Sequence, residues 1–95
     1  MIIIKSNLNL KCDKCGASFD VDKNRLEMNV ISNERSMGEE LLYNYYENVS
    51  CECGNEIHIE INGYEYPFGI LNHEEFEIWG GQYIYSPVLS ISLMQ

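Results

Sequence analysis

Four cysteines are the residues of this chain whose type and spacing could do chemistry. Two residues separate Cys12 from Cys15, one residue separates Cys51 from Cys53, and a glycine directly follows each pair. Two thiolates this close in sequence can hold one metal ion from a tight turn, and the glycine accepts the backbone angles that such a turn needs. Two such pairs complete a tetrahedral site. We therefore predict one metal ion bound by all four cysteines.

Zinc is the metal expected at a site of four thiolates. A catalytic zinc keeps one coordination position open, and four cysteines leave none, so the zinc is expected to be structural. Iron bound as in rubredoxin fits less well, because that family has two residues between the cysteines of both pairs. The alternatives are two disulfides or two pairs of free thiols. A redox Cys-x-x-Cys site would need a βαβ scaffold, which the sequence does not predict.

Strand-like segments flank both cysteine pairs, and with them the chain resembles the zinc ribbon superfamily, which is built from two knuckle-bearing β-hairpins. The similarity covers residues 8–21 and 48–62. The chain is also weakly similar to bacterial CpXC-type domains, although these have proline after the first cysteine, where this sequence has Asp13. The resemblance implies a metal-binding role for the four cysteines. It implies no particular activity, because zinc ribbons serve in nucleic-acid machines, in protein docking and as structural struts.

A chain of 95 residues is expected to form a single domain, here zinc-ribbon-like and spanning residues 1–95. A core of this size is thin and often needs support from a metal or disulfides. No apolar run approaches the roughly 20 residues of a membrane span. The segment 1–5 lacks the basic leader of a signal peptide. We therefore expect a cytoplasmic protein, in a reducing compartment where disulfides do not persist.

Alternation of apolar and polar residues predicts a mostly β fold, with a zinc-ribbon core of knuckle-bearing hairpins extended by further antiparallel hairpins. Strands are expected on both sides of each cysteine pair, and again at residues 26–30 and 88–93. At most one short helix is expected. Its candidate is Ser36–Tyr46, where Ser36 and Glu39 have capping-box spacing. The stretch Tyr43–Tyr46 fits a strand equally well.

Asn62 and Gly63 predict a two-residue hairpin turn between strands at Ile57–Ile61 and Tyr64–Phe68, because both residues tolerate positive φ. This register places Glu65 on the solvent face. It gathers the apolar side chains on the other face: Ile57, Ile59, Ile61, Tyr64, Tyr66 and Phe68. A second hairpin is predicted at the pair of glycines 80 and 81, between strands at residues 75–79 and 82–86.

The net charge of −9 is unevenly distributed. Residues 1–35 contain all six basic residues and five acids, which gives +1, whereas residues 36–95 contain ten acids and no Lys or Arg, which gives −10. Ten of the eleven aromatic residues also lie in this acidic part. We predict a docking surface for a basic partner protein around Trp79, Glu77 and Tyr64. The alternative is that these rings fill a thin core and its rim.

The expected function is that of a non-enzymatic zinc protein that binds another protein. One alternative is an acidic inhibitor or antitoxin that occupies a nucleic-acid site of its target. Another is nucleic-acid binding through the first hairpin, where Lys11 and Lys14 lie, although neighbouring aspartates and the overall charge make nucleic acid an unfavourable partner. His58 and His73 are interpreted as exposed residues near carboxylates. No nucleophile elbow or phosphate-binding loop suggests an enzyme.

Overall fold

The computed structural model describes residues 1–92, and in this range it consists of strands, turns and one short 3-10 helix. The elements in chain order are β1 (Ile2–Ile4), β2 (Leu8–Cys12), β3 (Ser18–Val21), η1 (Lys23–Arg25), β4 (Glu27–Arg35), β5 (Gly38–Ser50), β6 (Glu56–Glu65), β7 (Leu71–Trp79), β8 (Gly81–Tyr83) and β9 (Leu89–Ile91). The prediction of a mostly β fold is confirmed. No helix of residues 1–92 has the length and apolar character that crossing a membrane requires.

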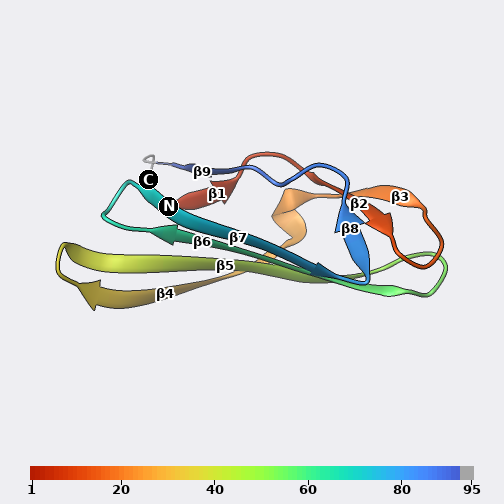
Figure 1. Cartoon of the computed structure of the whole chain (residues 1–95), viewed down its shortest axis with the longest axis horizontal. Coiled ribbons are helices and arrows are strands. Elements are labelled where there is room, and N and C mark those ends of the chain that lie inside the picture. Colours follow the sequence, from red (N-terminus) through yellow and green to blue (C-terminus); the bar gives the residue numbers. More distant parts are fainter. Residues whose placement is uncertain (93–95) are drawn as a thin grey trace.

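The strands form one large and two small antiparallel sheets. The large sheet has the order β4-β5-β6-β7, and the small ones are β1-β9 and β3-β2-β8. Both small sheets lie over the same face of the large sheet, so the molecule has two layers and an elongated shape of 48 × 21 × 18 Å (Figure 1). The other face of the large sheet, which we call the open face, is not covered by any element of residues 1–92.

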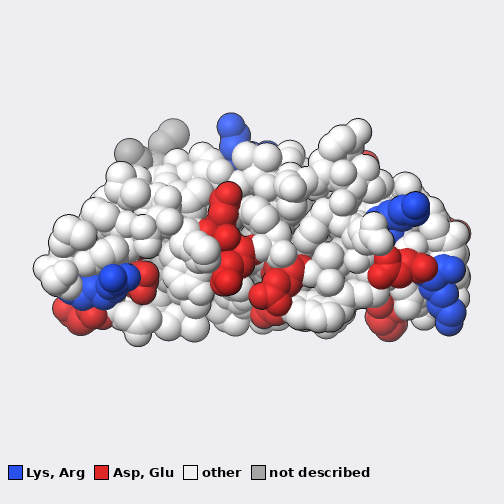
Figure 2. Space-filling model, viewed as in Figure 1, with Lys and Arg blue, Asp and Glu red and all other residues white. Residues whose placement is uncertain are grey.

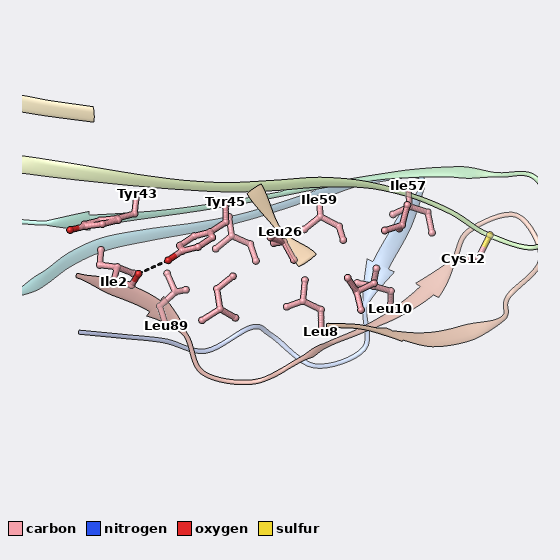
Figure 3. Close-up of a cluster of buried hydrophobic side chains, with 14 of the residues drawn as sticks. Ile2, Leu8, Leu10, Cys12, Leu26, Tyr43, Tyr45, Ile57, Ile59 and Leu89 are labelled. Carbon is pink, nitrogen blue, oxygen red and sulfur yellow. Dashed lines mark hydrogen bonds between the residues drawn. The ribbon is translucent and has the colours of Figure 1, made fainter. Parts of the chain in front are cut away.

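The hydrophobic core fills the space between the two layers (Figure 3). Ile57, Ile59 and Ile61 alternate along β6 with their side chains fully buried, and Leu8 and Leu10 face them from β2. Burying side chains of this size stabilises a fold by about 1.5–3 kcal/mol each. The predicted apolar alternation in these strands is therefore correct, and it keeps the sheets together along the length of the molecule.

The candidate helix at Ser36–Tyr46 is wrong, because β5 begins at Gly38, and the alternative of a strand at Tyr43–Tyr46 is confirmed. The chain turns at residues 36–37, and β5 then pairs with β4 on one side and with β6 on the other. Tyr43 and Tyr45 alternate into the core, and the hydroxyl of Tyr45 donates a 2.6 Å hydrogen bond to the carbonyl oxygen of Ile2 (Figure 3). Pairing on both sides and burial of aromatic rings outweigh the local capping-box preference.

The predicted hairpin turn at Asn62 and Gly63 is also wrong, because β6 runs straight through both residues. Neither residue has positive φ. The reversal comes a few residues later, at residues 66–70, where the backbone N–H of Tyr66 donates to the carbonyl oxygen of Ile70 at 2.9 Å. The Asn-Gly pair is a strong turn signal only when the flanking strands can pair with each other, and here β6 pairs with β5 and β7 instead.

The continuous strand changes which side chains are buried. Glu65, predicted on the solvent face, has no exposed surface, and Phe68, predicted in the core, is 71% exposed. Side chains alternate between the two faces along β6, and Ile61 and Gly63 face the core. Tyr64, the residue after Gly63, therefore points to the open face. The displaced turn therefore reverses the predicted burial of Glu65 and Phe68, whereas Tyr66, also predicted to be buried, is only 6% exposed.

The second predicted hairpin is partly correct in the positions of its strands, since β8 includes only the first two residues of the predicted 82–86, and it is wrong in its pairing. β7 ends at Trp79 and β8 begins at Gly81, as expected from the two glycines. However, β8 pairs with β2, whereas β7 pairs with β6. Gly80 is the point at which the chain leaves the large sheet and enters the other layer. The predicted last strand is β9, and Leu93 of that prediction lies outside the described residues.

Candidate metal centre

The first cysteine pair lies in the turn between β2 and β3. The backbone N–H of Gly16 donates to the carbonyl oxygen of Cys12 at 3.0 Å, and the N–H of Cys12 donates to Ala17 at 2.9 Å. Gly16 has φ of 78°, a conformation that residues with a Cβ rarely adopt. These bonds close a tight loop that holds Cys12 and Cys15 on one side of the turn, as the spacing predicts.

The second pair lies in the turn between β5 and β6 and is built in the same way. The N–H of Cys51 donates to the carbonyl oxygen of Asn55 at 2.8 Å, and the N–H of Gly54 donates to Cys51 at 2.9 Å. Gly54 has φ of 92°. Both cysteine pairs therefore lie in loops of hairpins, one hairpin from each layer.

The two loops bring all four sulfur atoms together, within 4.8 Å of one another. Sγ of Cys12 lies 3.7 Å from Sγ of Cys53, and Sγ of Cys15 lies 3.5 Å from Sγ of Cys51. Four sulfurs arranged tetrahedrally around zinc at about 2.3 Å are about 3.8 Å apart, so the observed spacing fits one ion. It does not fit disulfides, whose sulfurs are about 2.05 Å apart, and all four cysteines are free.

The thiols differ in how readily they lose a proton. Backbone hydrogen bonding at Cys15, together with the side chain of Asn55, lowers the pKa of Cys12 from 9.0 to about 6. For Cys51, the backbone N–H of Cys53 lowers the pKa, but the thiol of Cys15, burial and the other thiols outweigh it and raise the pKa to about 12. One thiolate forms readily, and further thiolates beside it need a compensating positive charge. A divalent cation supplies that charge.

Asn55 is a residue of this centre that sequence reasoning missed. Its side-chain Nδ2 lies 3.4 Å from Sγ of Cys12 and donates a 2.8 Å hydrogen bond to the carbonyl oxygen of Gly80. It therefore joins the second loop both to a sulfur of the first loop and to the end of β7. The only signal in the sequence is that an amide residue directly follows the second cysteine pair and its glycine.

Gly80 fixes the first loop against the large sheet. Its carbonyl oxygen accepts a 3.2 Å hydrogen bond from the backbone N–H of Asp13, between the first two cysteines. A Cβ on Gly80 would stand 2.3 Å from the carbonyl oxygen of Glu56, and φ is 84°, so only glycine fits. The two layers are thus joined at the metal centre by backbone contacts.

The centre is half accessible from outside. Cys12 and Cys51 are buried, whereas Cys15 and Cys53 are exposed, so each loop contributes one thiol of each kind. Beside them lies a cavity of about 410 Å³. Its lining residues come from both loops: Cys15, Ala17, Ser18, Phe19, Ser50, Cys51 and Glu52. A chelator can therefore reach the centre without unfolding the protein.

The three residues predicted to bind a partner all lie on the open face. Glu77 pairs with Glu60 and Trp79 pairs with His58 across β6 and β7, and Tyr64 pairs with His73 farther along the same strands. Directly paired residues of an antiparallel ladder share a face. Trp79 is 50% exposed and Glu77 is exposed, whereas Tyr64 is half-buried. The structure therefore brings these residues to one surface, spread along two strands.

Acidic residues dominate this open face. The ladder places six glutamates on it: Glu27, Glu40, Glu56, Glu60, Glu75 and Glu77. Arg35 is the one Lys or Arg that the strand register places there, and its Nη1 pairs with Glu40 at 3.0 Å. Figure 2, which views the two layers from the side, shows acidic side chains in the middle of the molecule and also beside the basic ones at both ends.

The two histidines lie on the open face, apart from the cysteines. Nδ1 of His58 is 2.7 Å from the amide oxygen of Asn48, and its ring packs against Trp79 with centroids 5.3 Å apart. His73 is exposed beside Glu75. Each has neighbouring side chains that account for its position, as expected of histidines on a polar strand face.

Comparisons with protein-family models, with curated proteins and with solved structures find no match to this chain.

Proposed function

We propose that this chain is a non-enzymatic, zinc-ribbon-like protein in which one structural zinc ion joins two β layers and the open face binds a basic partner protein. Zinc binding is supported by the four sulfur atoms that lie within 4.8 Å of one another. Binding of a basic partner is supported by the open face, which has six glutamates and one arginine that is already paired. Four cysteine ligands leave zinc no open position, so the ion acts as a structural link.

Elemental analysis tests the metal. The purified protein should contain close to one zinc per chain and no iron. Zinc binding requires thiolates, so acidification should protonate the cysteines and release the metal. Protein that contains neither metal, or that contains iron in its place, would contradict the assignment.

Cysteine substitution tests the structural role. Structural zinc contributes about 10 kcal/mol or more of apparent binding free energy in small domains, comparable with the whole stability of such a fold. Cys51→Ser should therefore separate the two layers and leave the protein largely unfolded. Ser50→Ala, one residue away and exposed, is the matched control. A Cys51→Ser variant that melts within a few degrees of the wild type would make the metal peripheral.

The partner is expected to be a protein rich in Lys and Arg. A face of glutamates repels nucleic acid and attracts basic protein surfaces, mainly by raising the association rate. Tyr46, Tyr64 and Trp79 place aromatic rings among these carboxylates, the combination found at the centres of protein interfaces. Purification of the tagged protein from its native host, with and without Trp79→Ala, tests this. Retardation of DNA or RNA at physiological salt, without a protein partner, would instead favour the first hairpin as a nucleic-acid site.

A further inference from the structure

The long edge strand β4 is bare over its whole length. All nine of its residues are exposed, and β5 is its one neighbour in the ladder. In Figure 1 no described element lies beyond it. Such an edge offers a row of unpaired N–H and C=O groups to another strand.

The register determines which of these groups point outward. In an antiparallel sheet, successive residues of a strand bond alternately to the neighbour on one side and to the neighbour on the other. The N–H of Cys51 bonds to Asn55, so the odd-numbered residues of β5 bond to β6. The even-numbered residues of β5 therefore bond to β4. Their partners in β4 are odd-numbered, for example Ile31 opposite Leu42. The even-numbered residues of β4 therefore direct their N–H and C=O groups away from the sheet: Met28, Val30, Ser32 and Glu34.

The two edges of the large sheet differ in how they are protected. The opposite edge, β7, contains Glu74, Glu75 and Glu77 within nine residues, a common means of preventing strands from pairing. β4 contains an uncharged segment of six residues, Met28–Asn33, with Val30 47% and Ile31 50% exposed. The charges of β7 thus lie within the strand, whereas those of β4 lie only at its ends, at Glu27, Glu34 and Arg35.

A second copy of β4 complements this edge in one register. Only the even-numbered residues of β4 direct their N–H and C=O groups outward. Each bonded pair between the two copies must therefore join two even-numbered residues. With a two-fold axis through Ile31, Val30 bonds to Ser32 and Met28 bonds to Glu34 of the second copy. The same register sets Glu27 of each chain opposite Arg35 of the other, which also pairs with Glu40 of its own chain. A shift by one hydrogen-bonded step in either direction loses both of these charge pairs.

We propose that two copies of this chain pair antiparallel through β4, about a two-fold axis at Ile31, to form one continuous eight-stranded sheet. Ile31 and its symmetry mate then cover each other, and Glu27 at one end of the strand is matched by Arg35 at the other. The axis is perpendicular to the sheet, so the two open faces lie side by side on one surface. The interface is isologous, as in most protein dimers.

Light scattering coupled to gel filtration tests the proposal on the full, zinc-loaded chain. The wild type should have a mass of about 22 kDa, twice the 11.0 kDa of one chain. Ile31→Lys places two lysines face to face on the axis, and Val30→Pro removes an outward N–H without removing a bond to β5. Both variants should elute at 11.0 kDa and keep the circular dichroism spectrum of a folded β protein, with a melting temperature lowered only by the loss of association. Ile84→Lys, at an exposed isoleucine of the other layer, should remain dimeric.

A charge exchange tests the register. Glu27→Arg and Arg35→Glu should each raise the dimer Kd about tenfold, since each sets like charges opposite each other twice. The double variant should return the Kd to near the wild-type value. A wild type that stays at 11.0 kDa up to about 1 mM chain would overturn the dimer. A dimer that survives both Ile31→Lys and Val30→Pro would show that a different surface pairs.

Discussion

Gly63 of β6 lies directly against Ile2 of β1: a Cβ added to the glycine would stand 2.9 Å from Cδ1 of Ile2 and 3.2 Å from Cδ1 of Leu89. Ile2 and Leu89 belong to the two strands of the small sheet β1-β9, which packs on the large sheet at this point. The absence of a side chain on Gly63 therefore allows the two layers to approach closely. The glycine serves layer packing and has no role in a turn.

Gly63→Ala should destabilise the protein by about 1–3 kcal/mol, the usual cost of adding a group to a well-packed core. Denaturant unfolding measures this. In an Ile2→Ala background the added methyl has room, so the same substitution should cost much less. An equal cost in both backgrounds would locate the effect in the backbone preference of residue 63 and not in its contact with Ile2.

Glu65 should be sensitive to substitution although it is a charged residue. It is fully buried, its Oε2 accepts a 2.9 Å hydrogen bond from the N–H of Gly69, and its Oε1 lies 3.3 Å from the amino group of Met1. Glu65→Ala removes the acceptor of the Gly69 N–H, whereas the amino group of Met1 keeps its 3.1 Å bond to the carbonyl oxygen of Ser92, and we expect a cost of about 1–3 kcal/mol. Glu75→Ala, on the exposed side of β7, should change stability by less than about 0.5 kcal/mol. Equal effects at both sites would contradict the continuous strand β6.

Asn55 should influence metal affinity without being a ligand. Removing residues that orient metal ligands typically lowers affinity about 10–100-fold. Asn55→Ala should weaken zinc binding in this range, measured by competition with a chromogenic chelator. Asn29→Ala, an exposed amide on β4, serves as the control. Unchanged affinity in Asn55→Ala would show that the 3.4 Å contact with Cys12 has no effect on the metal.

Stability should fall in alkaline solution. Burial raises the pKa of Tyr43, Tyr45 and Tyr83 above 10.0, and the carboxylates of Glu65 and Glu77 add to this at Tyr43 and Tyr83 respectively. The folded state then prefers neutral phenols. The contribution of these tyrosines to the free energy of unfolding is complete below pH 10. It is lost as the pH rises through their raised pKa values in the folded state, because the unfolded chain ionises first. Urea unfolding at pH 9 and at pH 11 should show this loss, and Tyr83→Phe should reduce it.

The metal centre could be predicted from the sequence because its signal is local. Each cysteine pair lies in one turn, and the turn needs its own glycine, so residues a few positions apart contain the information. The same holds for the buried alternation of Ile57, Ile59 and Ile61. Asn55 was missed because its role depends on Cys12 and Gly80, which lie far away in the sequence.

Pairing between distant strands could not be predicted from local signals. Asn62 and Gly63 have the composition of a turn, and Ser36 and Glu39 have the spacing of a helix cap. In both places the neighbouring strands decide the outcome, since a strand bonded on two sides gains more than a local turn or cap provides. The close approach of Ile2 that requires Gly63 involves residues 61 positions apart in the chain.

Binding of a basic partner should depend more on Trp79 than on any single glutamate of the open face. The ring is 50% exposed and stacks near His58, so its removal costs contact area in the complex while leaving the core intact. Trp79→Ala should weaken binding about 30-fold or more, and Glu77→Gln only a few-fold, since buried aromatic anchors contribute more than rim charges. Binding should also weaken as salt rises, because exposed charges are screened within about 8 Å at physiological ionic strength. Tyr85→Ala, at a more exposed aromatic residue away from the open face, is the control, and titration calorimetry at two salt concentrations measures all four effects. Affinity that holds constant in salt, or that falls equally in Trp79→Ala and Tyr85→Ala, would place the binding surface elsewhere than on the open face.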